Sequence, residues 1–223
     1  PDSTPRVGSV ATVDPMSSGR GWVAAALVGY VVGNLPSADL AARAAGGPDV
    51  SGEGTQNPGA MNASHVLGKK WGVAVSAVDI GKGAVAARVG QRFAGPTGAN
   101  IAATAAVAGH CFPIGRRGGK GVATSIGQVA ATFPSYLPVD IGVAIGTSAL
   151  PFFKQRTRVA TTVASATWVG CAALSWRRRF RNPGGVEPTA ALPLAALASS
   201  VVIAIRFAAE VDKVDDYNRG VAA

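Results

Sequence analysis

The segment from residue 109 to residue 124, GHCFPIGRRGGKGVAT, combines an imidazole, three cations and several glycines directly before an apolar run. Glycines let backbone N–H groups approach an anion closely, and the cations add positive charge. The segment is not a nucleotide-binding P-loop, because the first glycine of G-x-x-x-x-G-K-S/T is displaced and the lysine is followed by Gly121 and Val122. It therefore predicts a phosphate cradle. The candidate ligands are Arg116, Arg117, Gly118, Gly119 and Lys120.

A second polar segment, residues 33–62, alternates glycines with hydroxyl and amide side chains. At the entrance to a helix, such a stretch can turn several backbone N–H groups towards one point and form an anion site. An ordinary polar turn is the alternative, and this segment alone does not decide between them. Its candidate ligands are Asn34, Thr55, Asn57, Gly59 and Asn62.

Lys82 lies within an apolar run, in the sequence Asp79-Ile-Gly-Lys-Gly, where an unpaired ammonium group is energetically costly. Asp79 is three residues earlier on the same helical face and can neutralise the lysine as a structural ion pair. Snorkelling to the membrane interface is a second structural explanation. The functional explanation is contact with a phosphate, which makes Lys82 a candidate catalytic residue.

His110 and Lys120 complete the candidate catalytic set. His110 can orient a hydroxyl group or hydrogen-bond a phosphate, and a packing role is the alternative for a lone histidine. Cys111 and Cys171 form neither a CxxC pair nor a disulfide framework, so we expect two free, buried thiols. No metal-ligand spacing is present, and we predict neither a metal nor a cofactor.

The composition favours a membrane protein over a soluble one. Apolar residues make up 48% of the 223 residues, charged residues only 15%, and the mean hydropathy is +0.27. The net charge of +9 is compatible with anionic lipid or phosphorylated substrates. Aromatic residues make up only 6% and the cations sit in short clusters, which disfavours nucleic-acid binding. An alanine-rich soluble helical protein is the alternative.

Apolar runs separated by charged or Pro/Gly-rich breaks predict an all-α, polytopic transmembrane bundle of about seven helices. We interpret residues 1–20 as a disordered or mistranslated leader, residues 21–208 as the membrane domain and residues 209–223 as a polar tail. The runs are 21–35, 71–88, 98–114, 121–133, 136–153, 158–175 and 189–208.

The positive-inside rule predicts that the amino terminus lies outside and that the cationic loops at 36–70, 115–120 and 154–158 lie inside. The same count places the basic cluster 177–181, RRRFR, on the outside, against the rule. Either one short segment does not cross the membrane, or the rule is broken at this cluster.

The motifs, taken in order, resemble those of the bacterial integral-membrane acyl-phosphate:glycerol-3-phosphate acyltransferases. The resemblance covers roughly residues 25–150. The matching motifs are G-x-x-P at 33–36, N-P-G-A-x-N at 57–62, L-G-K-K at 67–70, D-x-x-K-G at 79–83, G-H-x-F-P at 109–113 and G-G-K-G-V-A-T at 118–124.

This resemblance implies a seven-helix protein of the bacterial cell membrane whose motif loops face the cytoplasm. It also implies transfer of a fatty acyl group from acyl phosphate to the 1-hydroxyl of glycerol 3-phosphate, giving lysophosphatidic acid for phospholipid synthesis. The partners would be these two substrates and membrane lipid. Clustered cations and N–H donors suit this chemistry, because two phosphorylated substrates repel each other. An acyl phosphate is already activated, so a protein nucleophile is unnecessary.

The chain departs from the family pattern mainly in the second polar segment. Asn34 replaces serine, Ser51 replaces arginine, Thr55-Gln56 replaces Ser-Gly, and Met61 replaces threonine. The loop from Pro113 to Gly118 is also shorter. Losing a loop arginine removes charge that phosphate binding would use. The alternative function is therefore a weak or inactive paralogue, acting as a membrane protein that binds lipid or anions, or as a transporter.

Overall fold

The computed structural model describes residues 18–150 and 156–209, and every regular element in these ranges is helical. Most of the predicted leader and nearly all of the predicted tail lie outside the described residues, whereas residues 18–20 already belong to the first helix. The elements are α1 (Ser18–Gly33), α2 (Ser37–Ala45), α3 (Ala60–Leu67), α4 (Lys69–Cys111), α5 (Val122–Thr132), the 3₁₀ turn η1 (Pro134–Tyr136), α6 (Leu137–Ala149), α7 (Arg156–Arg178) and α8 (Ala191–Ala209).

The seven apolar runs coincide with α1, two limbs of α4, and α5 to α8. This confirms the predicted all-α, polytopic bundle. One expectation was wrong: the polar region 36–70 is not simply a loop, because it contains the short helices α2 and α3. α2 ends at Gly46, whose left-handed conformation (φ 62°) lets backbone N–H groups return to the carbonyls of Ala42 and Arg43.

Helix α4 is a hairpin of two limbs and not one straight rod. Ala94 and Gly95 leave the helical conformation, and Pro96 starts the second limb. The limbs touch at Gly90 and Gly98, where a Cβ on either glycine would overlap the backbone carbonyl of the other. The chain therefore returns to the end from which α4 started, and Asp79 and His110 come from different limbs.

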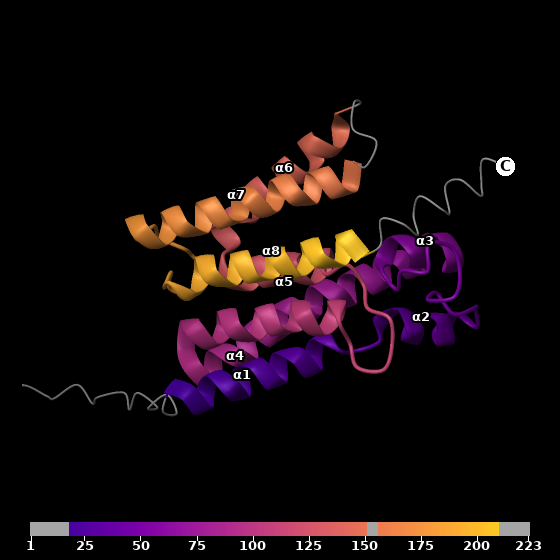
Figure 1. Cartoon of the computed structure of the whole chain (residues 1–223), viewed down its shortest axis with the longest axis horizontal. Coiled ribbons are helices and arrows are strands. Elements are labelled where there is room, and N and C mark those ends of the chain that lie inside the picture. Colours follow the sequence, from indigo (N-terminus) through magenta and orange to yellow (C-terminus); the bar gives the residue numbers. More distant parts are fainter. Residues whose placement is uncertain (1–17, 151–155, 210–223) are drawn as a thin grey trace, which may run out of the picture.

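Three helical segments of the described chain are long and apolar enough to cross a membrane, namely Gly19–Ala45, Thr157–Arg178 and Ala191–Ala209. A fourth candidate is the pair Val122–Thr132 and Pro134–Thr147, bent by 115°. In Figure 1, α1 and α4 form one side of the bundle, α6 and α7 form the other, and α5 and α8 lie between them.

Glycines allow the helices around α4 to pack closely. A Cβ on Gly29 or Gly33 of α1 would overlap the carbonyl of Ala102 or Ala106 in α4, and Gly127 of α5 meets the Ile80 carbonyl in the same way. Small residues at such crossings allow helices to associate in lipid, where hydrophobicity alone does not bring them together.

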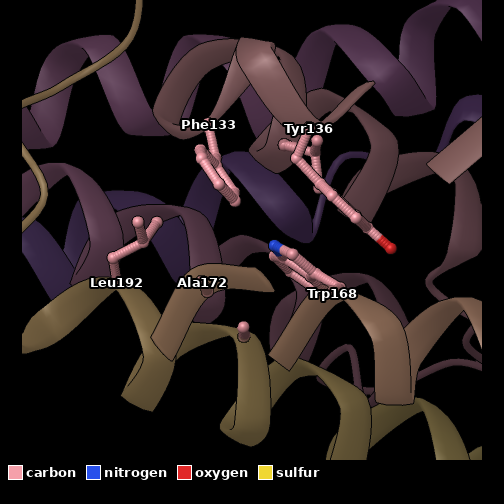
Figure 2. Packing of buried hydrophobic residues seen from close by; sticks show 7 residues of the cluster. Phe133, Tyr136, Trp168, Ala172 and Leu192 are labelled. Carbon is pink, nitrogen blue, oxygen red and sulfur yellow. The ribbon is translucent and has the colours of Figure 1, made fainter. Parts of the chain in front are cut away.

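Larger side chains join α5, α7 and α8. Phe133 and Tyr136 stack with ring centroids 5.6 Å apart, and they face Trp168 and Leu192 in the cluster of Figure 2. A buried hydrogen bond also joins α8 to α5, because the Ser199 hydroxyl donates to Gln128 Oε1 at 2.8 Å. These contacts fix α8 against the helices that carry the polar motifs.

The polar motifs gather at one end of the bundle. The loop between α4 and α5 reaches towards α2 at the right of Figure 1, where α1 ends and α4 both begins and ends. The connection from α7 to α8 lies at the opposite end, where Asn182 Nδ2 donates to the Thr132 carbonyl at the end of α5 and Arg88 donates to the Gly184 carbonyl.

Candidate functional site

A buried ion pair joins the first limb of α4 to the turn between α1 and α2. Lys82 Nζ lies 2.7 Å from Asp79 Oδ1, and the two residues are only 3% and 1% exposed. The same ammonium group donates to the Leu35 carbonyl at 2.7 Å and to Ser37 Oγ at 3.1 Å. Ser37 in turn donates its hydroxyl proton to Asp79 Oδ1 at 2.6 Å.

All three protons of the Lys82 ammonium group therefore have acceptors. Of the alternatives left open by the sequence, the structure shows the ion pair and excludes snorkelling, because the lysine is buried. Asp79 is the partner that the sequence offered for an ion pair, whereas Ser37 was not predicted. The signal for Asp79 was its i,i+3 spacing, whereas nothing in the sequence identified Ser37 or the Leu35 carbonyl.

His110, at the end of the second α4 limb, extends this network. Its Nδ1 lies 3.5 Å from Asp79 Oδ1, and its side chain is 7% exposed. The other ring nitrogen, Nε2, lies against Gly119, where a Cβ would overlap it. A larger residue at position 119 would have to displace the imidazole, so the imidazole and the glycine segment are in direct contact.

The glycine segment is held from two sides. The Gly119 N–H donates to the His110 carbonyl at 3.1 Å, and a Cβ on Gly118 would overlap the Cys111 carbonyl. From α8, Arg206 donates through Nη2 to the Gly118 carbonyl at 2.6 Å and through Nε to the Gly119 carbonyl at 3.2 Å. Sequence reasoning missed Arg206, which is a single cation near the end of a distant apolar run.

A small pocket lies where these elements meet, with about 230 Å³ of empty space that includes the solvent at its mouth. One wall is the first turn of α2, which has no side-chain cap. The Ser37 N–H of this turn donates to the Leu35 carbonyl, and the helix dipole places partial positive charge at this end. The cations of the lining are Lys82, Arg116 and Arg117, and Asp39 is acidic. The remaining lining residues are Gly33, Leu35, Ser37, Ala38, Pro58, His110, Gly118 and Gly119.

The structure thus brings six of the sequence-predicted residues to one pocket. They are Lys82, His110, Arg116, Arg117, Gly118 and Gly119. The other candidates lie outside its lining, and their contact with substrate stays a prediction. They are Asn34, Thr55, Asn57, Gly59, Asn62 and Lys120.

Two of these outer residues have clear contacts of their own. Asn62 Oδ1 accepts from the Thr55 N–H at 3.0 Å, while its Nδ2 donates to the carbonyls of Val50 and Glu53. This side chain therefore folds the loop before α3. Lys120 Nζ lies 4.9 Å from the centroid of the Phe207 ring, in a cation–π contact with α8.

Arg117 joins the two polar loops. Its Nη1 donates to Gln56 Oε1 at 2.6 Å and to the Ser51 carbonyl at 3.3 Å. Both partners stand at positions that depart from the family pattern. Gln56 has a positive φ of 58°, a conformation that favours the glycine of that pattern, and its side chain here receives the arginine. The two loops predicted to share one side of the membrane are therefore in contact.

Across residues 18–150 and 156–209 there is no group of three or more His, Cys, Asp or Glu side chains placed to hold a metal ion. Cys111 is buried, with 1% exposure, and lies outside the pocket lining. The pocket lining offers cations, one imidazole, the Ser37 hydroxyl and the Asp39 carboxylate.

Comparison with known proteins gives a consistent result. The sequence profile of the glycerol-3-phosphate acyltransferase family matches residues 23–214. A glycerol-3-phosphate acyltransferase of Thermoanaerobacter sp. (strain X514) is 35% identical over 156 residues, covering 69% of this chain and 77% of the relative. One from Maricaulis maris (strain MCS10) is 35% identical over 158 residues, covering 70% and 71%.

Two solved structures share the fold. The crystal structure of PlsY (YgiH), an integral membrane glycerol 3-phosphate acyltransferase, in its glycerol 3-phosphate form has a TM-score of 0.70 and 24% identity, covering 86% of this chain and 91% of that one. The lysophosphatidic acid form gives a TM-score of 0.68 at 23% identity, with the same coverage.

The buried ion pair leads to a stability prediction. Asp79→Leu leaves the Lys82 ammonium group buried without its counter-charge, and we expect the free energy of unfolding to fall by about 3–5 kcal/mol. Asp79→Leu combined with Lys82→Met removes both charges and should recover most of that loss. Thermal unfolding of the detergent-solubilised protein measures both effects. A double variant no more stable than Asp79→Leu alone would contradict the proposed charge pairing.

Proposed function

We propose that this chain, which belongs to the glycerol-3-phosphate acyltransferase family, transfers a fatty acyl group from acyl phosphate to the 1-hydroxyl of glycerol 3-phosphate, giving lysophosphatidic acid. The observation that carries the proposal is the pocket in which the uncapped first turn of α2, two arginines and His110 converge. Helix N-termini and arginine are the groups that bind phosphate best in proteins.

The charge of the pocket lining suits anionic substrates. Asp79 balances the charge of Lys82, so the positive charge left in the lining comes from Arg116 and Arg117 and is only partly offset by Asp39. Neither arginine has an ion-pair partner among the described residues. Charge neutralisation of this kind lowers the repulsion between two phosphorylated substrates and allows their reacting groups to approach.

In the proposed reaction the substrate hydroxyl attacks the carbonyl carbon of the acyl phosphate. A carbon–oxygen bond forms to glycerol 3-phosphate, the bond to the phosphate oxygen breaks, and inorganic phosphate leaves. The proton of the hydroxyl passes to His110 Nε2 or to the departing phosphate. Asp79 supports the imidazole from its Nδ1 side, which leaves Nε2 at the glycine segment.

The assay of this function uses purified full-length protein, acyl phosphate and glycerol 3-phosphate, with lysophosphatidic acid detected by mass spectrometry. We expect turnover with acyl phosphate, none with acyl-CoA alone, and no loss on adding EDTA. Arg116→Gln should lower kcat/KM about ten- to hundred-fold, because a charge-assisted contact contributes about 1.5–3 kcal/mol. The exposed Arg43→Gln is the matched control.

Failure of wild-type turnover, with glycerol 3-phosphate binding retained, would instead support the alternative of an inactive paralogue that binds anions. The specific observation behind this alternative is Ser51, which leaves the first loop without the arginine of the family pattern. Arg117 reaches the Ser51 carbonyl and brings an arginine back to this loop from the other segment.

Arg206 provides a second test, because it acts through the glycine segment. Two of its guanidinium nitrogen atoms, Nε and Nη2, donate to the carbonyls of two consecutive residues. Lysine has a single ammonium group and cannot reproduce this two-point contact. We expect Arg206→Lys to lower kcat about ten-fold or more, since small misplacements in a site have effects of this size. The melting temperature should stay near that of wild type. Unchanged kcat in a folded Arg206→Lys protein would remove Arg206 as a positioning residue.

We also propose a multi-pass protein of the bacterial inner membrane with the pocket end in the cytoplasm, since the pocket loops carry lysines and arginines. In a Cys111→Ala, Cys171→Ala background, Gly52→Cys and Ile114→Cys should resist a membrane-impermeant maleimide in intact cells. Glu187→Cys, at the other end, should react. If one of positions 52 and 114 reacted with the maleimide and the other did not, the two loops could not form a shared pocket.

A further inference from the structure

The end of the bundle opposite the pocket carries an unusual concentration of positive charge. Residues 176–181, here called the arginine turn, comprise the end of α7 and the residues that follow it. All six side chains are exposed. In order they are Trp176, Arg177, Arg178, Arg179, Phe180 and Arg181.

The four arginines of this turn have no ion-pair partner within residues 18–150 and 156–209. The described ion pairs all involve Asp79, which lies near the pocket. One acidic residue, Glu187, lines the adjacent groove. The positive charge of the turn is therefore largely uncompensated, and it is presented outwards.

Arg179 ends α7 in a left-handed conformation that arginine seldom adopts. Its φ of 51° is left-handed, and the N–H groups of Arg179 and Phe180 return to the carbonyls of Trp176 and Ser175. Glycine is the residue that usually ends a helix in this way. An arginine in this position carries backbone strain that glycine would relieve.

A preformed groove lies beside the turn. It contains about 880 Å³ of empty space open to solvent, and its lining includes Arg179, Phe180 and Arg181. Asn182 Nδ2 holds the groove segment to the Thr132 and Val186 carbonyls, both at 2.8 Å, and Arg88 binds the Gly184 carbonyl at 2.9 Å. Hydrogen bonds from side chains to backbone carbonyls thus anchor the groove to α4 and α5.

Aromatic side chains show what kind of anion this surface suits. Trp176 is 42% exposed and Phe180 is 53% exposed, and both lie among the arginines at the end of a helix apolar enough to span a membrane. Exposed aromatic rings and arginines together mark the border between acyl chains and headgroups. A soluble anion would use the charge but would leave the rings without a partner.

We propose that the arginine turn and its groove bind the headgroup phosphate of an anionic phospholipid, at a site separate from the pocket. The arginines contact the phosphate, and the two rings contact the upper part of the acyl chains. Inorganic phosphate has the negative charge of such a headgroup but no acyl chains for the two rings to contact. The inference does not depend on the proposed enzymatic activity.

The experiment uses delipidated full-length protein in a zwitterionic detergent. The rise in melting temperature is measured on adding phosphatidylglycerol, phosphatidylcholine or inorganic phosphate. We expect a rise with phosphatidylglycerol only. The double variant Arg179→Gly, Arg181→Gln should need at least about ten-fold more phosphatidylglycerol for the same rise in melting temperature, because each arginine near an anionic surface contributes to binding.

The matched control is Lys69→Gln with Lys70→Gln, which removes two exposed charges at the other end and should behave like wild type. Arg177→Gln with Arg178→Gln is a second test within the turn, and it serves if the first variant is not folded by circular dichroism. Equal responses of wild type and both turn variants would overturn the proposal. So would an equal response to phosphatidylcholine or to inorganic phosphate.

Discussion

The buried pair of Asp79 and Lys82 is the interaction on which the pocket depends. A lysine that is 3% exposed is tolerated only if its counter-charge and all its protons are accommodated. The turn after α1 therefore has to present the Leu35 carbonyl and Ser37 Oγ to it. This requirement fixes where α2 begins, and the first turn of α2 forms a wall of the pocket.

Close packing of backbones makes this arrangement possible. Gly29 and Gly33 let α1 approach the second limb of α4, and the hairpin brings that limb back beside Asp79. His110 then reaches both the carboxylate and Gly119. A larger residue at position 119 would displace either the imidazole or the segment that Arg206 holds. The polar contacts of the site are thus consequences of glycine positions many residues away.

The sequence predicted the helices well because apolar runs are long and continuous, and it predicted much of the pocket because its cations and glycines cluster locally. The sequence did not predict contacts in which the partner of a side chain is distant along the chain or is a backbone atom. α2 and α3, with 9 and 8 residues, are too short to show a clear apolar run. Arg206 is far along the sequence from the carbonyls to which it donates. Asn62 was predicted to bind substrate, but its side chain hydrogen-bonds the loop before α3.

The arginines of this chain show how the same side chain has different consequences at the two ends of the bundle. Arg117 donates to the loop before α3 and Arg206 donates to the glycine segment, so their charge is held at the pocket end of the bundle. The arginines of residues 177–181 are exposed to solvent, and Arg179 and Arg181 line a wide groove. Cations gathered at a small pocket suit a small, highly charged ligand, whereas exposed cations beside aromatic rings suit the headgroup of a lipid. The cluster at 177–181, which the positive-inside rule does not predict, is the part of the chain to which we assign the proposed lipid headgroup site.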